Sequence, residues 1–244
     1  MAAGLSLVPG GGMARGPAGV GDPARTGHVE PVARAIGDRW PLPGAGAAPT
    51  LAELFASSPR DGGWAGFLLA QLDRDRPLLW VQERMAILEG GRVYPPGFHF
   101  TDLIHVEARD AKAALWAMEE GLRCAAIGAV IGEIWGDPAA LDFTATRRLA
   151  VAAERHGVAA WLVRLGGSAN LSGARRRWRV ASRPSLPHPL NPRAPGAAVW
   201  DCELFRARGH APGRWMVTHE PAGDFHLVAA AGDRALGEDQ RRAG

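Results

Sequence analysis

The sequence predicts an α/β protein built on a mostly parallel sheet, and its segment order and composition carry that prediction. From residue 49 to 165, short apolar runs of strand length alternate with helical segments of about ten to fifteen residues, the pattern of repeated βαβ units. After residue 165 the helical segments stop and strands with alternating faces follow, so antiparallel strands extend the sheet. Apolar residues make up 47% and charged residues 22% of the 244, as in a globular chain of one or two domains.

Five apolar runs have the length and composition of strands that are buried on both faces of a parallel sheet. They lie at 50–57, 77–82, 103–108, 126–135 and 158–165. A mostly apolar helix is expected at 62–72. Two further helices are expected after Asp110 and after Asp142 or Thr144, residue types whose side chains accept hydrogen bonds from the first N–H groups of a helix. The last helix is expected to end at Gly157, which suits the left-handed residue that follows a helix.

The remaining segments set the expected domain limits. Strands are expected at 176–182, 199–208, 213–220 and 224–230. Five prolines in fourteen residues predict an extended connector at 183–196. Residues 1–48 hold eleven glycines and six prolines with little apolar periodicity, so we expect them to be disordered, and 233–244 to form a frayed tail. One three-layer α/β/α domain over 49–232 is the resulting prediction.

Composition also excludes several classes of protein. No run approaches the ~20 apolar residues that a membrane-spanning helix needs, so we expect no membrane association. Cys124 and Cys202 are far apart and the eight histidines are scattered, which argues against a disulfide scaffold, a zinc site or any other metal centre. The N-terminal residues lack the basic and apolar regions of a signal peptide, so we expect a cytoplasmic protein. We also expect it to hold no cofactor.

The first turn between strand and helix is where an α/β nucleotide-binding protein holds phosphate, and here it is degenerate. The turn contains Asp61, Gly62 and Gly63, but it lacks the Gly-Lys-Ser/Thr that a phosphate-binding loop requires. Lys112 is the one lysine among the 28 basic residues, and it lies far along the chain. Asp61 would also repel a triphosphate. We therefore expect no ATP hydrolysis.

No other position predicts catalysis. Glu133 lies near the end of the most apolar strand, where an ATPase carries a water-activating acid; the favoured interpretation is a polar residue where a buried strand meets solvent. Residues 166–170 lack the second glycine of a nucleophile elbow. His105 is interpreted as a hydrogen-bonded or rim histidine rather than a base. The sequence thus predicts no catalytic residue.

Eight arginines face only two carboxylates between residues 175 and 208. Around Trp178 lie four of them: Arg175, Arg176, Arg177 and Arg179. An arginine-rich strand with a central tryptophan suits contact with DNA phosphates and base stacking. The favoured alternative is an edge strand whose charges prevent association with other sheets, and a protein-binding surface is the third.

Trp116 lies on the side of its helix opposite the apolar residues. It shares that side with Lys112, Glu119 and Arg123. Tryptophan and arginine are enriched at protein interfaces, so these four residues are candidate partner contacts. Burial of Trp116 at the edge of the helix–sheet contact is the favoured alternative.

Several blocks of the chain resemble the ImuA family, RecA-like and SulA-related proteins of bacterial mutagenesis cassettes. The strongest blocks are ARDAKAALWAMEEGLRCAAIGAVIGEIW (108–135) and LDFTATRRLAVAAERHGVAAWLVR (141–164). LLWVQER (78–84), GRVYPPG (91–97), RRRWRVAS (175–182) and WDCELFRARGHAPGRWMV (200–217) follow the same pattern. The resemblance covers about residues 49–232 and leaves out the first 48.

The resemblance implies a RecA-like sheet without ATP hydrolysis and a non-catalytic role in SOS-linked translesion DNA synthesis. It implies an ImuB polymerase-like protein as partner, with RecA and an error-prone replicative-type polymerase as further candidates. Two other functions stay open on the sequence: a SulA-like inhibitor of cell division that binds FtsZ, and a repair factor that binds DNA directly.

Overall fold

The computed structural model describes residues 48–73, 75–95, 102–219 and 225–228. The chain divides into two units, Met1–Glu30 and Pro31–Gly244, and the first lies wholly outside the described residues. So do most of the segment predicted to be disordered and the whole predicted tail. Every element below belongs to the second unit.

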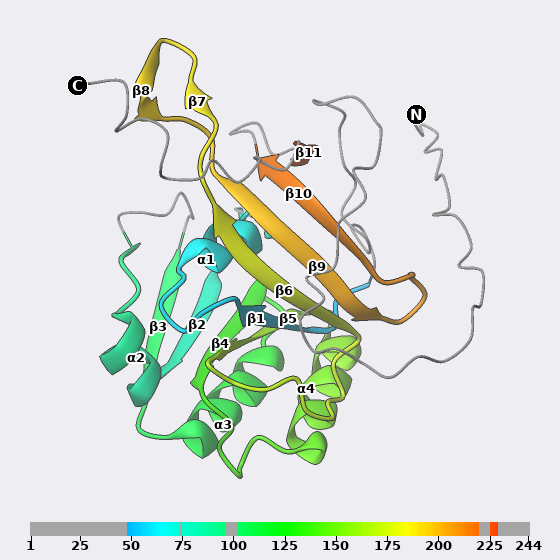
Figure 1. Ribbon diagram of the computed structural model, residues 1–244. Helices are drawn as coiled ribbons and strands as arrows, with labels where there is room; N and C mark the ends of the chain where they lie inside the picture. The colour runs from blue at the N-terminus through cyan, green and yellow to red at the C-terminus, as the bar shows by residue number, and fades with distance from the viewer. Residues whose placement is uncertain (1–47, 74, 96–101, 220–224, 229–244) are drawn as a thin grey trace, which may run out of the picture. The chain divides into compact units, whose positions relative to one another are not determined.

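Six strands form the parallel part of one nine-stranded sheet (Figure 1). They are β1 (Leu51–Ala56), β2 (Leu78–Glu83), β3 (Leu103–Ala108), β4 (Ala129–Trp135), β5 (Ala159–Leu165) and β6 (Arg176–Arg183). Their order across the sheet is β6-β1-β5-β4-β2-β3, and each neighbouring pair is parallel. Strand β1 therefore lies between the last two parallel strands of the chain, with its carboxyl end at the point where ligands bind in folds of this kind.

Antiparallel strands extend the sheet beyond β6. They are β9 (Val199–Ala207), β10 (Gly213–His219) and β11 (Phe225–Leu227), which follow β6 in that order. The prediction of a protective edge strand at 176–182 is wrong, because β6 is hydrogen-bonded to β1 on one side and to β9 on the other. The proline-rich segment forms a small separate hairpin from β7 (Pro187–His188) and β8 (Asn191–Pro195), where an extended connector was predicted.

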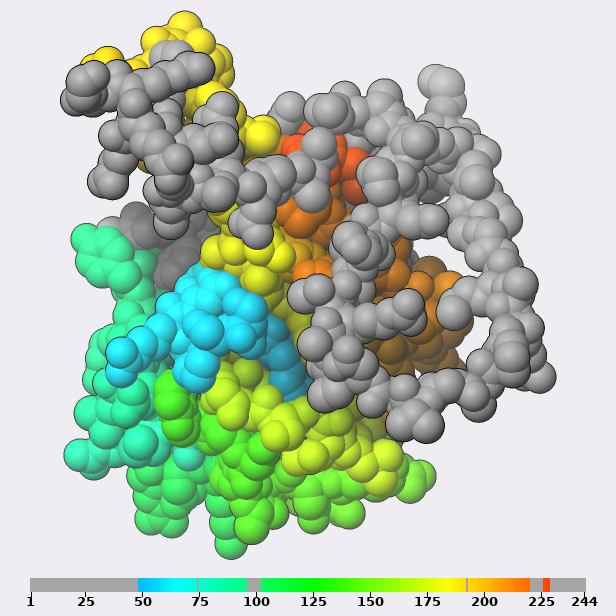
Figure 2. All heavy atoms as spheres, viewed as in Figure 1, coloured from blue at the N-terminus to red at the C-terminus, as the bar shows by residue number. Residues whose placement is uncertain are grey.

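Helices cover both faces of the sheet. On one face, α1 (Gly63–Leu69) places Phe67 against Trp178 and Trp200, and α2 (Arg84–Gly90) adds Ala86 to the same apolar cluster. The opposite face carries α3 (Ala111–Leu122) and α4 (Phe143–His156), whose apolar residues form a second cluster. Figure 2 shows the residues of α1, in cyan, at the surface on the side of the molecule that faces the viewer. The predicted three-layer RecA-like α/β/α class is confirmed.

The predicted helix ends are confirmed in α3 and α4. The Asp110 carboxylate accepts from the Ala113 N–H at 2.8 Å, and the Asp142 carboxylate from the Ala145 N–H at 2.7 Å. Asp142 is therefore the cap residue of α4. Gly157 ends α4 with φ +67°, a left-handed conformation that glycine adopts without a steric penalty.

Candidate functional site

The turn between β1 and α1 is held by a carboxylate of its own. Asp61 accepts hydrogen bonds from the Gly63 N–H at 3.0 Å and the Ser57 hydroxyl at 2.7 Å. It also accepts from Ser182, at the end of β6, through the N–H at 2.8 Å and through the hydroxyl. A negatively charged group thus already occupies the donors that surround this turn.

The electrostatics of this turn oppose a second anion. Partial burial alone would raise the pKa of Asp61, but the hydrogen bonds from Ser182, Ser57 and Gly63 outweigh it and lower the pKa to about 2. The carboxylate is therefore ionised at neutral pH. A Cβ on Gly63 would lie 2.0 Å from the Ser182 hydroxyl oxygen, so the turn packs directly against β6. A phosphate would meet both a fixed negative charge and a closed turn.

Glu133 lies beside this turn, at the wall of a cavity of about 370 Å³ that also contacts Trp64, Trp80 and Gln82. The Glu133 carboxyl accepts from the indole N–H of Trp80 and from the Gln82 amide at 3.1 Å. The favoured sequence interpretation is wrong: Glu133 is 4% exposed, because β4 continues two residues beyond it to Trp135. Burial raises its pKa to about 7, although its two hydrogen-bond donors oppose the shift.

Gln82 connects Glu133 to the surface, and the sequence did not single it out. Its amide oxygen accepts from the Val93 N–H at 2.9 Å and lies 3.0 Å from Nε2 of His105. Burial, together with the neighbouring Arg92, lowers the pKa of His105, which favours the neutral ring. His105 is thus hydrogen-bonded at the rim of the sheet, as interpreted from the sequence. The sequence feature that could have identified Gln82 is its position as a single polar amide inside an apolar strand.

A buried ion cluster lies under the other face of β1 and was also missed. The Arg177 guanidinium donates to Glu53 at 2.6 Å, and both side chains are almost fully buried. Arg164, equally buried, lies 3.8 Å from Glu53 and also pairs with Asp137. Because buried charges need partners, the charge of Glu53 is compensated by the two arginines, and Arg164 is further compensated by the partly exposed Asp137.

The four arginines predicted to contact DNA do not share one surface, because β6 lies inside the sheet. Arg177 is 3% exposed and Trp178 is fully buried, so neither reaches a nucleic acid at this strand. Half-buried Arg176 lies over the Trp161 ring. Arg179 is exposed and pairs with a carboxylate of β9 at 3.0 Å. Arg175, just before the strand, pairs with Glu154 of α4 at 2.6 Å.

The candidate partner contacts do share one surface, on the outer side of α3. Lys112, Trp116 and Arg123 are exposed there, with half-buried Glu119 between them. Trp116 is 64% exposed, so the favoured prediction that it is buried is wrong. The inner side of α3 is filled by smaller and aliphatic residues, which leaves the indole no place in the core. Glu119 accepts from Arg148 of α4 and lies 3.4 Å from Arg123.

Among the described residues, no helix has the length and hydropathy needed to cross a membrane. In the same part of the chain, no group of three or more His, Cys, Asp or Glu side chains is placed to hold a metal ion.

No family model matches the chain. The chain is 33% identical to Protein ImuA of Caulobacter vibrioides, strain NA1000 / CB15N, over 183 residues. The matched segment is 68% of this chain and 72% of that relative. Protein ImuA of a second strain of the species, ATCC 19089 / CB 15, matches equally. With this identity over most of both chains, the protein belongs to the ImuA family.

Proposed function

We propose that this protein is a non-catalytic accessory of damage-induced translesion DNA synthesis that acts by binding other proteins. Membership of the ImuA family supports a role in the ImuA/ImuB mutagenesis cassette. The observation that carries the non-catalytic part is the Asp61 carboxylate, which takes the hydrogen bonds of the β1–α1 turn in place of a phosphate. The lack of a lysine in this turn agrees with it.

The outer side of α3 is the proposed docking surface for the ImuB-type polymerase homologue. Trp116 offers a large side chain that is 64% exposed on an ordered helix. Tryptophan is among the residues that contribute most to binding energy when a partner covers them. Lys112 is exposed one turn before it and suits an acidic residue of a partner, whereas Arg123 on the same side of the helix is paired with Glu119 and Glu120. RecA and the error-prone replicative-type polymerase are proposed as further partners.

Affinity capture with the full-length ImuB-type protein of the same organism tests this proposal. The wild-type chain should capture that protein, and Trp116→Ala should weaken the affinity by at least about tenfold, the effect of losing a central interface tryptophan. Tyr94→Ala is the matched control, because Tyr94 is an aromatic residue that is 69% exposed elsewhere.

Three results would contradict the proposal in different ways. Failure of the wild-type chain to capture the ImuB-type protein would remove that partner. Capture that Trp116→Ala leaves unchanged would remove the α3 surface. Equal losses from Trp116→Ala and Tyr94→Ala would point to a general loss of apolar surface rather than to one site.

A further inference from the structure

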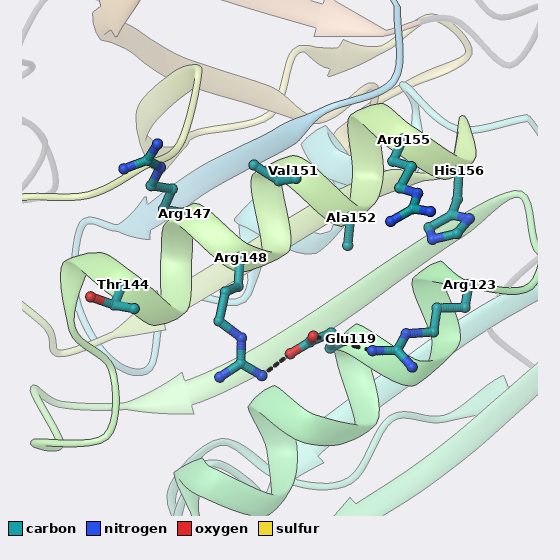
Figure 3. Close-up of a pocket in the computed structure, with 9 residues that line it drawn as sticks. All are labelled: Glu119, Arg123, Thr144, Arg147, Arg148, Val151, Ala152, Arg155 and His156. Carbon is teal, nitrogen blue, oxygen red and sulfur yellow. Dashed lines mark hydrogen bonds and ion pairs between the residues drawn. The ribbon is translucent and has the colours of Figure 1, made fainter.

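Helix α4 separates two grooves that its exposed residues help to line. The first lies between α3 and α4, has a volume of about 570 Å³, and is shown in Figure 3. The second, of about 580 Å³, lies between α4, the segment before β6 and the end of β9. Arg147 and Val151 line both grooves, so the outer side of α4 joins them into one surface.

This surface, called the α4 surface below, has strong and largely uncompensated positive charge. Seven arginines and one carboxylate, that of Glu119, line the two grooves. Glu119 is already paired with Arg148 and Arg123, as the dashed lines in Figure 3 mark. Nearby Glu154 is paired with Arg175.

Four of the arginines are exposed and free to bind a ligand. They are Arg147, Arg155, Arg206 and Arg208. None of the four makes an ion pair with the described residues, although Arg208 is close enough to Glu154 to help lower the pKa of that carboxyl. In Figure 3, Arg155 and His156 at the end of α4 lie across the first groove from Arg123 of α3.

The chemistry of the surface favours phosphate over protein. Protein interfaces are depleted of charge at their centre, whereas nucleic-acid interfaces are polar and strongly positive. Guanidinium groups bind phosphate oxygens in pairs of parallel hydrogen bonds. Phe143, 40% exposed at the start of α4, lines the second groove and presents a ring on which an unpaired base can stack.

We propose that the α4 surface binds single-stranded DNA, with its arginines on the phosphates and Phe143 stacked on a base. Of the four residues 175–177 and 179, to which the sequence analysis assigned DNA contact, Arg175 alone lines these grooves. Glu119 and Arg123 border both this surface and the proposed docking surface, whereas Lys112 and Trp116 line neither groove. The α4 surface therefore adds a nucleic-acid contact beside the proposed protein contact.

Fluorescence anisotropy of a labelled oligothymidine of twenty nucleotides, with the full chain, tests the proposal. With four phosphates contacted, log affinity should fall against log salt with a slope of about −3, from roughly −0.7 per contact on a single strand. The double variant Arg147→Glu/Arg206→Glu should bind at least about tenfold more weakly, with a less steep slope. Phe143→Ala should weaken binding about tenfold, as expected for one lost stacking contact.

The matched control is Arg60→Glu/Arg193→Glu, which changes the net charge equally at exposed positions on the β1–α1 turn and in β8. It should stay within about twofold of the wild type, since long-range effects of exposed charges are screened by salt. Circular dichroism and thermal melting check that each variant folds. If Arg147→Glu/Arg206→Glu does not fold, Arg155→Glu/Arg208→Glu replaces it with the same expected loss.

Several outcomes would overturn the proposal. They are absence of binding at 50 mM salt, equal losses in the control variant, and tighter binding of duplex than of single-stranded DNA. Displacement of the oligothymidine by polyglutamate at equal charge concentration would assign the surface to an acidic protein segment instead. Capture of the ImuB-type protein by Arg147→Glu/Arg206→Glu is expected to match the wild type, so this test and that of the α3 surface fail independently.

Discussion

Arg177 and Arg179 lie two positions apart on β6, and their surroundings differ sharply. Arg177 packs against the rings of Phe55 and Phe205, which also contact each other edge to face, and pairs with buried Glu53. Arg179 lies over the same Phe205 ring, at 4.1 Å, but its side chain is 49% exposed and pairs with Glu203 at the surface. An arginine therefore contributes more to the stability of the fold at position 177 than at position 179.

Replacing these two arginines separately tests that difference. Arg177→Ala should lower the free energy of unfolding by about 3–5 kcal/mol, because Glu53 is left as a buried charge with its nearest partner removed. Arg179→Ala should lower it by only about 1–2 kcal/mol, through loss of an exposed ion pair and of an exposed cation–π contact with Phe205. Urea unfolding followed by tryptophan fluorescence measures both. Equal effects of the two substitutions would contradict the burial of the Glu53 pair.

Glu133 should make stability depend on pH. The folded protein holds the proton up to a pKa of about 7, whereas the unfolded chain releases it near 4.5. The folded state therefore binds more protons between these values, so this group lowers stability as pH rises from 4.5 through 7. Glu133→Gln stays neutral and still accepts from Trp80. Its free energy of unfolding, compared with that of the wild type, should therefore increase by on the order of 3 kcal/mol as pH rises from 4.5 to 8.

Denaturant unfolding at a series of pH values measures this gain. Glu89→Gln is the control, because Glu89 lies exposed at the rim of the same cavity. A constant difference between Glu133→Gln and the wild type across the whole range would mean that folding does not shift the pKa of Glu133.

At the scale of elements, the close approach of α3 to β4 depends on a glycine. A Cβ on Gly132 would lie 2.1 Å from the sulfur of Met118, which is fully buried. Gly132→Ala should therefore lower the free energy of unfolding by about 1–3 kcal/mol, because the added methyl group overpacks this contact. In Gly132→Ala/Met118→Ala the new methyl group enters the space left by the methionine, so the double variant should lose less than the two single variants combined. If the two single losses of unfolding free energy add exactly in the double variant, Gly132 and Met118 are not in contact.

The helices and strands themselves were largely predictable, because the spacing of apolar residues and the residues that cap helices can be recognised within each short segment. Asp110, Asp142 and Gly157 mark helix ends in the sequence and in the structure. Helix α2 was missed, since its seven residues bury only Ala86 and show no apolar period. The edge-strand prediction at β6 failed because strand order is not local: β6 pairs in parallel with β1, over a hundred residues earlier.

At the scale of the whole molecule, the sequence identified residues better than their partners. The degenerate turn was visible as an Asp-Gly-Gly without lysine, but the Ser182 that closes it is 121 residues away. Glu53 and Arg177 are 124 residues apart, and neither position predicts a buried pair by itself. The two grooves beside α4 form only when α3, α4 and the end of β9 come together, so no local pattern predicted them.

The non-catalytic role proposed for this protein requires that the β1–α1 turn, closed by Asp61, binds no nucleotide. Isothermal titration with Mg-ATP, followed by a phosphate-release assay on the same protein, tests it most directly. We predict no saturable heat up to about 1 mM nucleotide, which corresponds to binding weaker than about −4 kcal/mol, and no phosphate release above background. Micromolar affinity with measurable turnover, in a preparation that also captures the ImuB-type protein, would contradict it.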